Sequence, residues 1–213
     1  MESISTTPLL WLVLGALVSF AVVINRIIFF FFRPLPLHIA SREGHYMVVK
    51  MLLLLPGIEV NLVNQSYETP LHIAASKGHD KIVEVLLEKE GIQVNLQCQS
   101  GRTALHLASF CRPSYRHEKV TELLLKRDDI EVNTTDINGQ TVLHFAASKD
   151  SFKVVKMLLK RQGIQVNLAN LAGITPISYA ANQRHGKTVN LLLGTDEIKA
   201  IGWEGWRPTA NPG

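Results

Sequence analysis

Thr69-Pro70-Leu71-His72-Ile73-Ala74 is the stretch that decides the fold, because its last four residues recur along the chain. Related tetrapeptides stand at residues 37–40, 71–74, 105–108, 143–146 and 177–180, at steps of 34, 34, 38 and 34 residues. A Val-Asn pair at residues 60–61, 94–95, 132–133 and 166–167 keeps the same register, at steps of 34, 38 and 34. Two independent markers therefore agree on a tandem repeat and on the place of four extra residues in its third unit.

Each repeat predicts a pair of helices joined to the next pair by a turn. Thr69 is a good N-cap, and Pro70 suits the first helical position, where its missing N–H costs nothing. The apolar positions within residues 82–87 have the spacing of a buried stripe on a second helix. Residues 136–139 place Asp first and Gly fourth, as a type I turn prefers. The sequence thus predicts an all-α array of five units, which are residues 33–66, 67–100, 101–138, 139–172 and 173–200.

These residues resemble the ankyrin-repeat family, whose unit carries a Thr-Pro-Leu-His-x-Ala signature in a helix–turn–helix followed by a projecting β-turn finger. The resemblance implies a solenoid of about five units that binds other proteins through a concave face of inner helices and fingers, without catalysis. Three positions depart from the pattern. Leu35 replaces the N-cap threonine of the first unit, Tyr67 takes a turn-glycine place, and Ser178 replaces the fifth histidine.

On this resemblance, the residues that vary between repeats on the concave face select the partner. They are Arg42, Ser76, Lys77, Phe110, Ser148, Lys149 and Gln183 on the inner helices, and Gln65, Gln97, Gln99, Asp136, Asn138 and Asn170 on the fingers.

The four extra residues of the third unit lie between its two helices, within residues 110–119. Phe110, Arg112, Tyr115 and Arg116 in this segment are of the types enriched at binding hot spots. We therefore expect this loop to help dock a partner; the alternative is that it is harmless slack, since loops on repeat scaffolds tolerate insertions.

Composition and motifs argue against other classes of function. The chain has 213 residues, a formal net charge of +4 and two cysteines, which excludes disorder throughout and a disulfide scaffold. From Arg33 onward, 21 basic and 17 acidic residues are interspersed, so no nucleic-acid-binding patch is expected. No nucleophile elbow, Walker loop, dinucleotide-binding turn or His-Glu-x-x-His motif is present. We expect a monomer that is not an enzyme and takes no small-molecule substrate or cofactor.

The histidines and cysteines also favour a structural interpretation. His72, His106 and His144 each follow a threonine by three residues at the same repeat position, so we interpret them as hydrogen-bonding groups between units. Cys98, His106, Cys111 and His117 include zinc-ligand types, but their spacing fits no paired zinc motif. No metal site is expected.

Residues 1–32 form a hydrophobic segment of different composition. Leu9 to Phe32 would make a helix of roughly 36 Å, enough for a hydrocarbon core of about 30 Å, if Arg26 lies near one interface. The basic residues at its C-terminal end predict a single-pass membrane protein with cytoplasmic repeats. The alternatives are a cleaved signal sequence and a stretch that is not native, and the protein would then be soluble in the cytoplasm or nucleus.

The two ends of the array carry further expectations. The first unit has Leu54 and Leu55 where later units place charged residues, so its end is uncapped. The hydrophobic segment, a bilayer or earlier repeats would cover it. Residues 201–213 form a tail rich in Trp, Gly and Pro. The function predicted is a non-enzymatic protein-binding scaffold, and the alternative is the truncated regulatory region of a larger enzyme or channel.

Overall fold

The computed structural model describes residues 35–110 and 115–195. Within these residues ten α-helices and no β-strands are found, which confirms the predicted all-α repeat fold. The pairs are α2 (Pro36–Glu43) with α3 (Tyr46–Leu53), α4 (Pro70–Lys77) with α5 (Asp80–Leu87), α6 (Ala104–Phe110) with α7 (Tyr115–Leu125), α8 (Val142–Ser148) with α9 (Phe152–Leu158), and α10 (Pro176–Asn182) with α11 (Gly186–Leu193).

Some predictions fall outside the described residues. The hydrophobic segment within residues 1–32, Arg112 and the tail 201–213 belong to this group. Among the helices that are described, none has the length and apolar character needed to cross a membrane.

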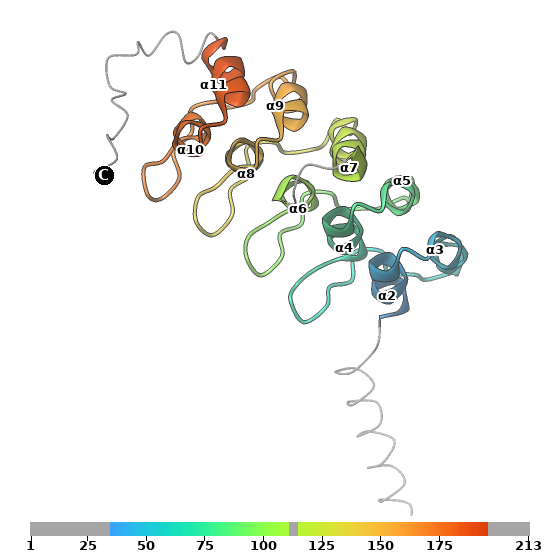
Figure 1. Ribbon diagram of the computed structural model, residues 1–213. Coiled ribbons are helices and arrows are strands. Elements are labelled where there is room, and N and C mark those ends of the chain that lie inside the picture. Colours follow the sequence, from blue (N-terminus) through green and yellow to red (C-terminus); the bar gives the residue numbers. More distant parts are fainter. Residues whose placement is uncertain (1–34, 111–114, 196–213) are drawn as a thin grey trace, which may run out of the picture. The chain divides into compact units, whose positions relative to one another are not determined.

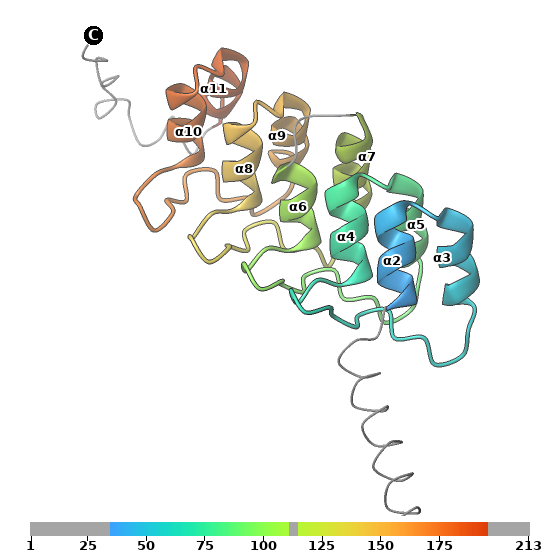
Figure 2. The ribbon, with the colours of Figure 1, turned by 60° about the horizontal axis from the view of Figure 1, so that its bottom comes forward.

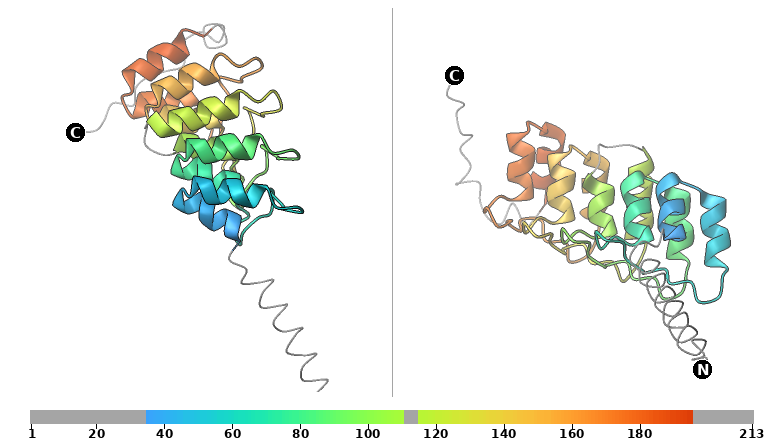
Figure 3. Two further views of the ribbon diagram at one scale, coloured as in Figure 1. Left: turned by 90° about the vertical axis from the view of Figure 1, so that its right-hand side faces the viewer. Right: turned by 90° about the horizontal axis from the view of Figure 1, so that it is seen from below.

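The helix pairs stack into two rows. The inner helices α2, α4, α6, α8 and α10 form one row, and the outer helices α3, α5, α7, α9 and α11 form the other (Figures 1 and 2). Between consecutive pairs the chain leaves the stack and returns, and these four fingers (residues 58–68, 92–102, 130–140 and 164–174) project from the same side (Figure 3). The inner helices and fingers together make one continuous surface, which we call the inner surface.

One apolar core runs through the whole stack. Ala74, Ala108 and Ala146 are at most 1% exposed, and their small side chains let neighbouring inner helices approach closely. Leucines from both rows fill this core, each contributing roughly 1.5–3 kcal/mol on burial. Those less than 2% exposed are Leu71, Leu105 and Leu143 on inner helices and Leu86, Leu124, Leu158 and Leu192 on outer helices.

The repeated histidine links each unit to the next. The Thr69 backbone N–H donates to His72 Nδ1 at 3.2 Å, and the Thr69 hydroxyl lies 2.8 Å from the same nitrogen. Because Nδ1 accepts a hydrogen bond, Nε2 carries the proton and donates to the Arg102 carbonyl oxygen at 3.1 Å. His106 and His144 repeat the arrangement, donating to the carbonyls of Gln140 and Ile174. The predicted structural role of the histidines is confirmed.

Two further hydrogen-bond ladders tie the units together. Asn61 Nδ2 donates to the Gly91 carbonyl at 2.7 Å, while its Oδ1 accepts the Gln93 N–H at 2.9 Å. Asn95 and Asn133 make the same pair of bonds to the following units. The fingers are joined by backbone bonds of 3.0–3.1 Å, in which the N–H groups of Gln99, Ile137 and Leu171 donate to the carbonyls of Ser66, Ser100 and Asn138.

The departures from the repeat pattern have visible structural effects. With Leu35 in place of threonine, His38 Nδ1 is buried and has no partner among the described residues, although Nε2 still contacts the Glu68 carbonyl at 3.0 Å. Tyr67 takes the left-handed backbone conformation of the finger glycine, with φ of 58°. In place of the histidine bridge, the Ser178 hydroxyl lies 2.9 Å from the Thr175 hydroxyl.

The outer helix of the first unit exposes apolar side chains. Met47, Met51 and Leu54 are 65%, 65% and 78% exposed. The position of Met47 is lysine in all four later units, at residues 81, 119, 153 and 187. At the position of Leu55, the Lys89 ammonium donates to the Leu53 carbonyl of the preceding unit at 2.9 Å. The first unit therefore lacks the lysine that its successors have at the position of Met47 and the bridging cation that Lys89 supplies in the second unit.

Acid should destabilise the stack through its buried histidines. Burial lowers the pKa of His72, His106 and His144 below 6.5, for His106 to about 4. At a pH between the pKa of a histidine in the folded chain and its higher pKa in the unfolded chain, the unfolded chain binds a proton that the folded chain excludes. The stability contributed by the neutral histidines is therefore fully present above pH 6.5 and is lost as the pH falls. We expect the free energy of urea unfolding to drop between pH 6.5 and 5, with His106 contributing up to ~1.4 kcal/mol per pH unit and His72 and His144 adding to the loss.

His106→Asn supplies the matched variant for this measurement. It removes one titrating group, so its stability should depend less steeply on pH than that of the wild-type chain, even though it is less stable at pH 7.5. Stability that rises as the pH falls from 6.5 to 5 would contradict the assignment of neutral buried histidines.

Lysine should be tolerated on the exposed side of α3. Because Met47 and Leu54 face solvent, Met47→Lys and Leu54→Lys are expected to change the free energy of urea unfolding by no more than ~0.5 kcal/mol. Leu53 lies on the buried side of the same helix, so Leu53→Lys should cost more than ~3 kcal/mol. A large loss in the first two variants would mean that this side of α3 is packed.

Candidate protein-binding surface

The four fingers are built so that one residue of each points away from the stack. In the third finger, Asp136 Oδ1 accepts the backbone N–H groups of Asn138 and Gln140 at 2.9 and 3.0 Å, and Gly139 closes the turn. Asn170 plays the same part in the fourth finger. The residue after each of these turn formers is left with an outward-facing side chain.

Asp136 and Asn170 are expected from sequence to face a partner, and the structure assigns them another role. The two residues are 5% and 9% exposed, and their side chains hold the turns. The physical reason is that the first residue of a type I turn uses its side-chain oxygen to bond the backbone two residues ahead. Both are therefore left out of the surface proposed below.

Most of the other predicted residues do lie on the inner surface. Two serines are half-buried and bond within their own helices, Ser76 to the Ile73 carbonyl and Ser148 to the Phe145 carbonyl, each at 2.9 Å. Those that are exposed are Arg42, Gln65, Lys77, Gln97, Gln99, Phe110, Tyr115, Arg116, Asn138, Lys149 and Gln183.

Gln97 is exposed but already engaged. Its amide nitrogen donates to the Gly101 carbonyl at 2.7 Å and to the Thr135 carbonyl at 2.9 Å, so it joins the second finger to the third. Its contribution to binding another protein would compete with this bridge.

The extra residues of the third unit lengthen an outer helix. By the repeat register α7 should start near Glu118, yet it begins at Tyr115, one turn earlier. Tyr115 is 77% exposed, whereas His117 Nε2 lies 3.1 Å from the Ser76 carbonyl. Arg116 lies next to Gly78 at the end of α4, since a Cβ on that glycine would meet the Arg116 Cβ at 3.2 Å. Part of the insertion is thus ordered helix beside the inner row.

A cluster of aromatic and cationic side chains forms where the third and fourth units meet. The Phe110 and Phe145 rings are edge to face with centroids 5.6 Å apart. The Arg102 guanidinium carbon lies 4.7 Å from the Phe110 centroid and 4.9 Å from the Phe145 centroid. Lys149 Nζ lies 5.1 Å from the Phe110 centroid. Phe145 is buried and Phe110 is 41% exposed, so one ring anchors the cluster and the other presents it to solvent.

The sequence-based set misses several residues at the inner surface. Ile137 and Leu171, at the tips of the third and fourth fingers, are 64% and 81% exposed. An aliphatic residue directly after the Asp or Asn of a turn is the signal that could have found them, because that position is exposed in both fingers. Arg102 and the buried Phe145 carry no such signal, since Phe145 contacts Phe110 and Arg102 from 35 and 43 positions away.

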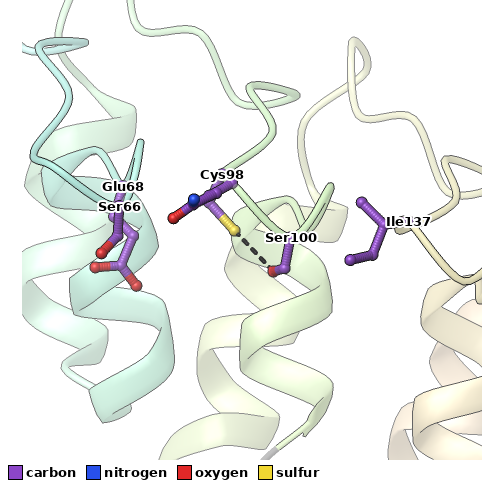
Figure 4. A pocket seen from close by; sticks show the side chains of 6 residues that line it. Ser66, Glu68, Cys98, Ser100 and Ile137 are labelled. Carbon is purple, nitrogen blue, oxygen red and sulfur yellow. Dashed lines mark hydrogen bonds between the residues drawn. The ribbon is translucent and has the colours of Figure 1, made fainter.

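A shallow hollow of about 460 Å³ runs across the tips of the first three fingers. Ser66 and Glu68 line one side, Cys98 and Ser100 the middle, and Ile137 the other side (Figure 4). The Cys98 thiol is 3.2 Å from the Ser100 hydroxyl. The hollow is open and offers polar, apolar and acidic walls side by side, which suits a segment of a protein chain better than a compact ligand.

The described residues offer little for chemistry. Among residues 35–110 and 115–195, no three His, Cys, Asp or Glu side chains lie close enough to hold a metal ion. The repeated histidines His72, His106 and His144 are buried and bonded on both nitrogens, and burial lowers the pKa of His106 to about 4. These histidines are therefore engaged in holding the units together.

Comparison with known proteins agrees with this geometry. The family pattern described as ankyrin repeats (3 copies) matches residues 37–136 and again residues 114–200. A comparison with curated proteins finds no match to this chain. Since the matched residues make up well over half of the sequence, and the histidine bridges and fingers repeat in register, the chain belongs to the ankyrin-repeat family.

Proposed function

We propose that this protein is a non-enzymatic scaffold that binds a partner protein through the inner surface of its five units. The observation that carries the proposal is the coincidence, on one side of the stack, of the half-exposed Phe110 cluster with the exposed tips Ile137 and Leu171. Aromatic, arginine and aliphatic side chains of this kind are the usual anchors of protein interfaces, and an exposed apolar patch marks a contact site.

Rigidity supports the proposal. The histidine, asparagine and finger ladders hold neighbouring units at a fixed spacing before any partner arrives. A preordered surface loses little conformational entropy on binding, so more of the contact energy remains as affinity. Five units offer enough area for an interface of ordinary size, on the order of 1,600 Å² in total.

The proposed surface combines the sequence-based set with the residues found in the structure. Arg112 stays a prediction, because it lies outside the described residues. The members are Arg42, Gln65, Ser76, Lys77, Gln97, Gln99, Arg102, Phe110, Tyr115, Arg116, Ile137, Asn138, Ser148, Lys149, Leu171 and Gln183.

A membrane tether is the second part of the proposal. It rests on the length and apolar character of Leu9 to Phe32, while the basic residues Arg26 and Arg33 would place the repeats of this monomeric scaffold on the cytoplasmic side. The exposed apolar side of α3 favours a different candidate function, in which the repeats regulate a larger enzyme or channel whose remaining part covers Met47, Met51 and Leu54.

Affinity capture with matched variants tests the scaffold function. The full chain is compared with an inner-surface variant, Phe110→Ala/Ile137→Ser/Leu171→Ser, and with an outer-surface variant, Lys81→Ala/Lys156→Ala/Gln162→Ala. Removing interface anchors typically costs 2 kcal/mol or more, so captured partners should fall at least about tenfold for the first variant and remain for the second. Partners lost equally with both variants, or with neither, would overturn the assignment of the binding side.

A further inference from the structure

Arg102 has hydrogen-bonding capacity that the described part of the chain does not use. Its Nε donates to Asp136 Oδ2 at 3.4 Å, and its side chain is 23% exposed. Within residues 35–110 and 115–195, neither terminal guanidinium nitrogen has a hydrogen-bond acceptor. A guanidinium presents these nitrogens as a planar fork that matches the two oxygens of a carboxylate.

The guanidinium is nevertheless held in place. Phe110 and Phe145 lie within 5 Å of its central carbon, and Asp136 contacts it from the third finger. The cost of ordering a long side chain is thus met before a ligand arrives. A group that recognises a carboxylate needs to be held in place while its terminal nitrogens remain available, and the Arg102 guanidinium meets both conditions.

In the neighbouring fingers, the polar side chain at the position equivalent to Arg102 has a hydrogen-bond partner. Gln140, one unit later, donates its amide to the Tyr179 hydroxyl at 2.6 Å. Glu68, one unit earlier, accepts from the Asn64 amide at 3.0 Å. Arg102 differs from these two residues, because its terminal guanidinium nitrogens have no acceptor in the described residues although its Nε contacts Asp136.

The local charge favours an acidic ligand. Lys149 places a second cation against the Phe110 ring, 5.1 Å from its centroid. The carboxylate of Asp136 is fully engaged, because Oδ1 accepts two backbone N–H groups and Oδ2 faces Arg102. Two cations therefore meet one carboxylate at this junction, and both lie against the ring of Phe110, which is 41% exposed.

We propose that Arg102 receives the carboxylate of an Asp or Glu side chain in the partner protein, with Lys149 as a second cation and Phe110 as the platform for an adjoining apolar residue. This inference rests on the proposed function and names the chemistry of the partner segment: an acidic residue next to an apolar one. The backbone nitrogen of Ile137 lies against Gly101, the residue before Arg102, so an exposed aliphatic side chain belongs to the finger next to this arginine.

A random dodecapeptide library displayed on phage provides the probe. It is panned on the immobilised full chain, and retained clones are those whose binding is lost on the finger-tip variant Ile137→Asp/Leu171→Asp. We expect these clones to be enriched in Asp or Glu beside an aromatic or aliphatic residue. Inner-surface clones without such enrichment would overturn the role of Arg102 and leave the binding side standing, whereas a complete lack of clones sensitive to the finger tips counts against the proposed function itself.

Synthetic peptides from the selection then test the contact by a double-mutant cycle. Replacing the acidic residue by its amide should weaken binding to the wild-type chain about tenfold, as should Arg102→Gln, and the two changes together should weaken it little further than either alone. Arg102→Lys keeps the charge but not the planar fork, so its affinity for the acidic peptide should lie between those of the wild-type chain and of Arg102→Gln. Arg127→Gln, an arginine paired with Asp129 on the outer side, is the control and should have no effect. Additive losses would refute a direct Arg102–carboxylate contact, and the peptide substitution reports on it even if Arg102→Gln folds poorly.

Discussion

The buried histidine bridge is the constraint on which the rest of the structure depends. Its ring accepts from a threonine of its own unit and donates to a carbonyl one unit ahead, so a single neutral tautomer fixes the start of an inner helix and the base of the next finger. Loss of the ring would leave the buried threonine N–H without its partner, which costs more than the bond itself contributes. Three copies of this bridge join the second unit to the third, the third to the fourth and the fourth to the fifth.

The histidine bridge and the asparagine ladder satisfy the backbone hydrogen-bonding groups between units. Side chains at the finger tips are therefore not needed to hold the units together. The residue after each turn former donates only its backbone N–H to the preceding finger, as Ile137 and Leu171 do. Its side chain can vary without loosening the array. Variation at fixed spacing is what allows a repeat surface to discriminate between partners.

Sequence reasoning recovers the features that repeat and misses those that do not. Period, helix pairing and the structural histidines follow from the residues at steps of 34, because identical contacts demand identical residues. The same logic fails for Asp136, a polar residue whose burial depends on the turn closing over it, and for the Arg102 cluster, which arises between unlike residues of different units. The one-turn extension of α7 is also local to a single unit, so no neighbouring copy could reveal it.

Arg102 shows the same separation between a backbone that holds the units together and a side chain that can vary. At that position the backbone carbonyl is fixed by His72, so the side chain can be arginine, glutamate or glutamine in different units without disturbing the bridge. Glutamine and glutamate find partners inside the stack, whereas arginine is long enough to pass over Phe145 and reach the rim beside Phe110. The aliphatic stem of Arg102 and its contacts with the two rings contribute packing, while its terminal nitrogens remain accessible to water. The lack of a protein acceptor for these nitrogens therefore costs little folding stability. The stack can therefore hold a charged recognition group ready without giving up stability.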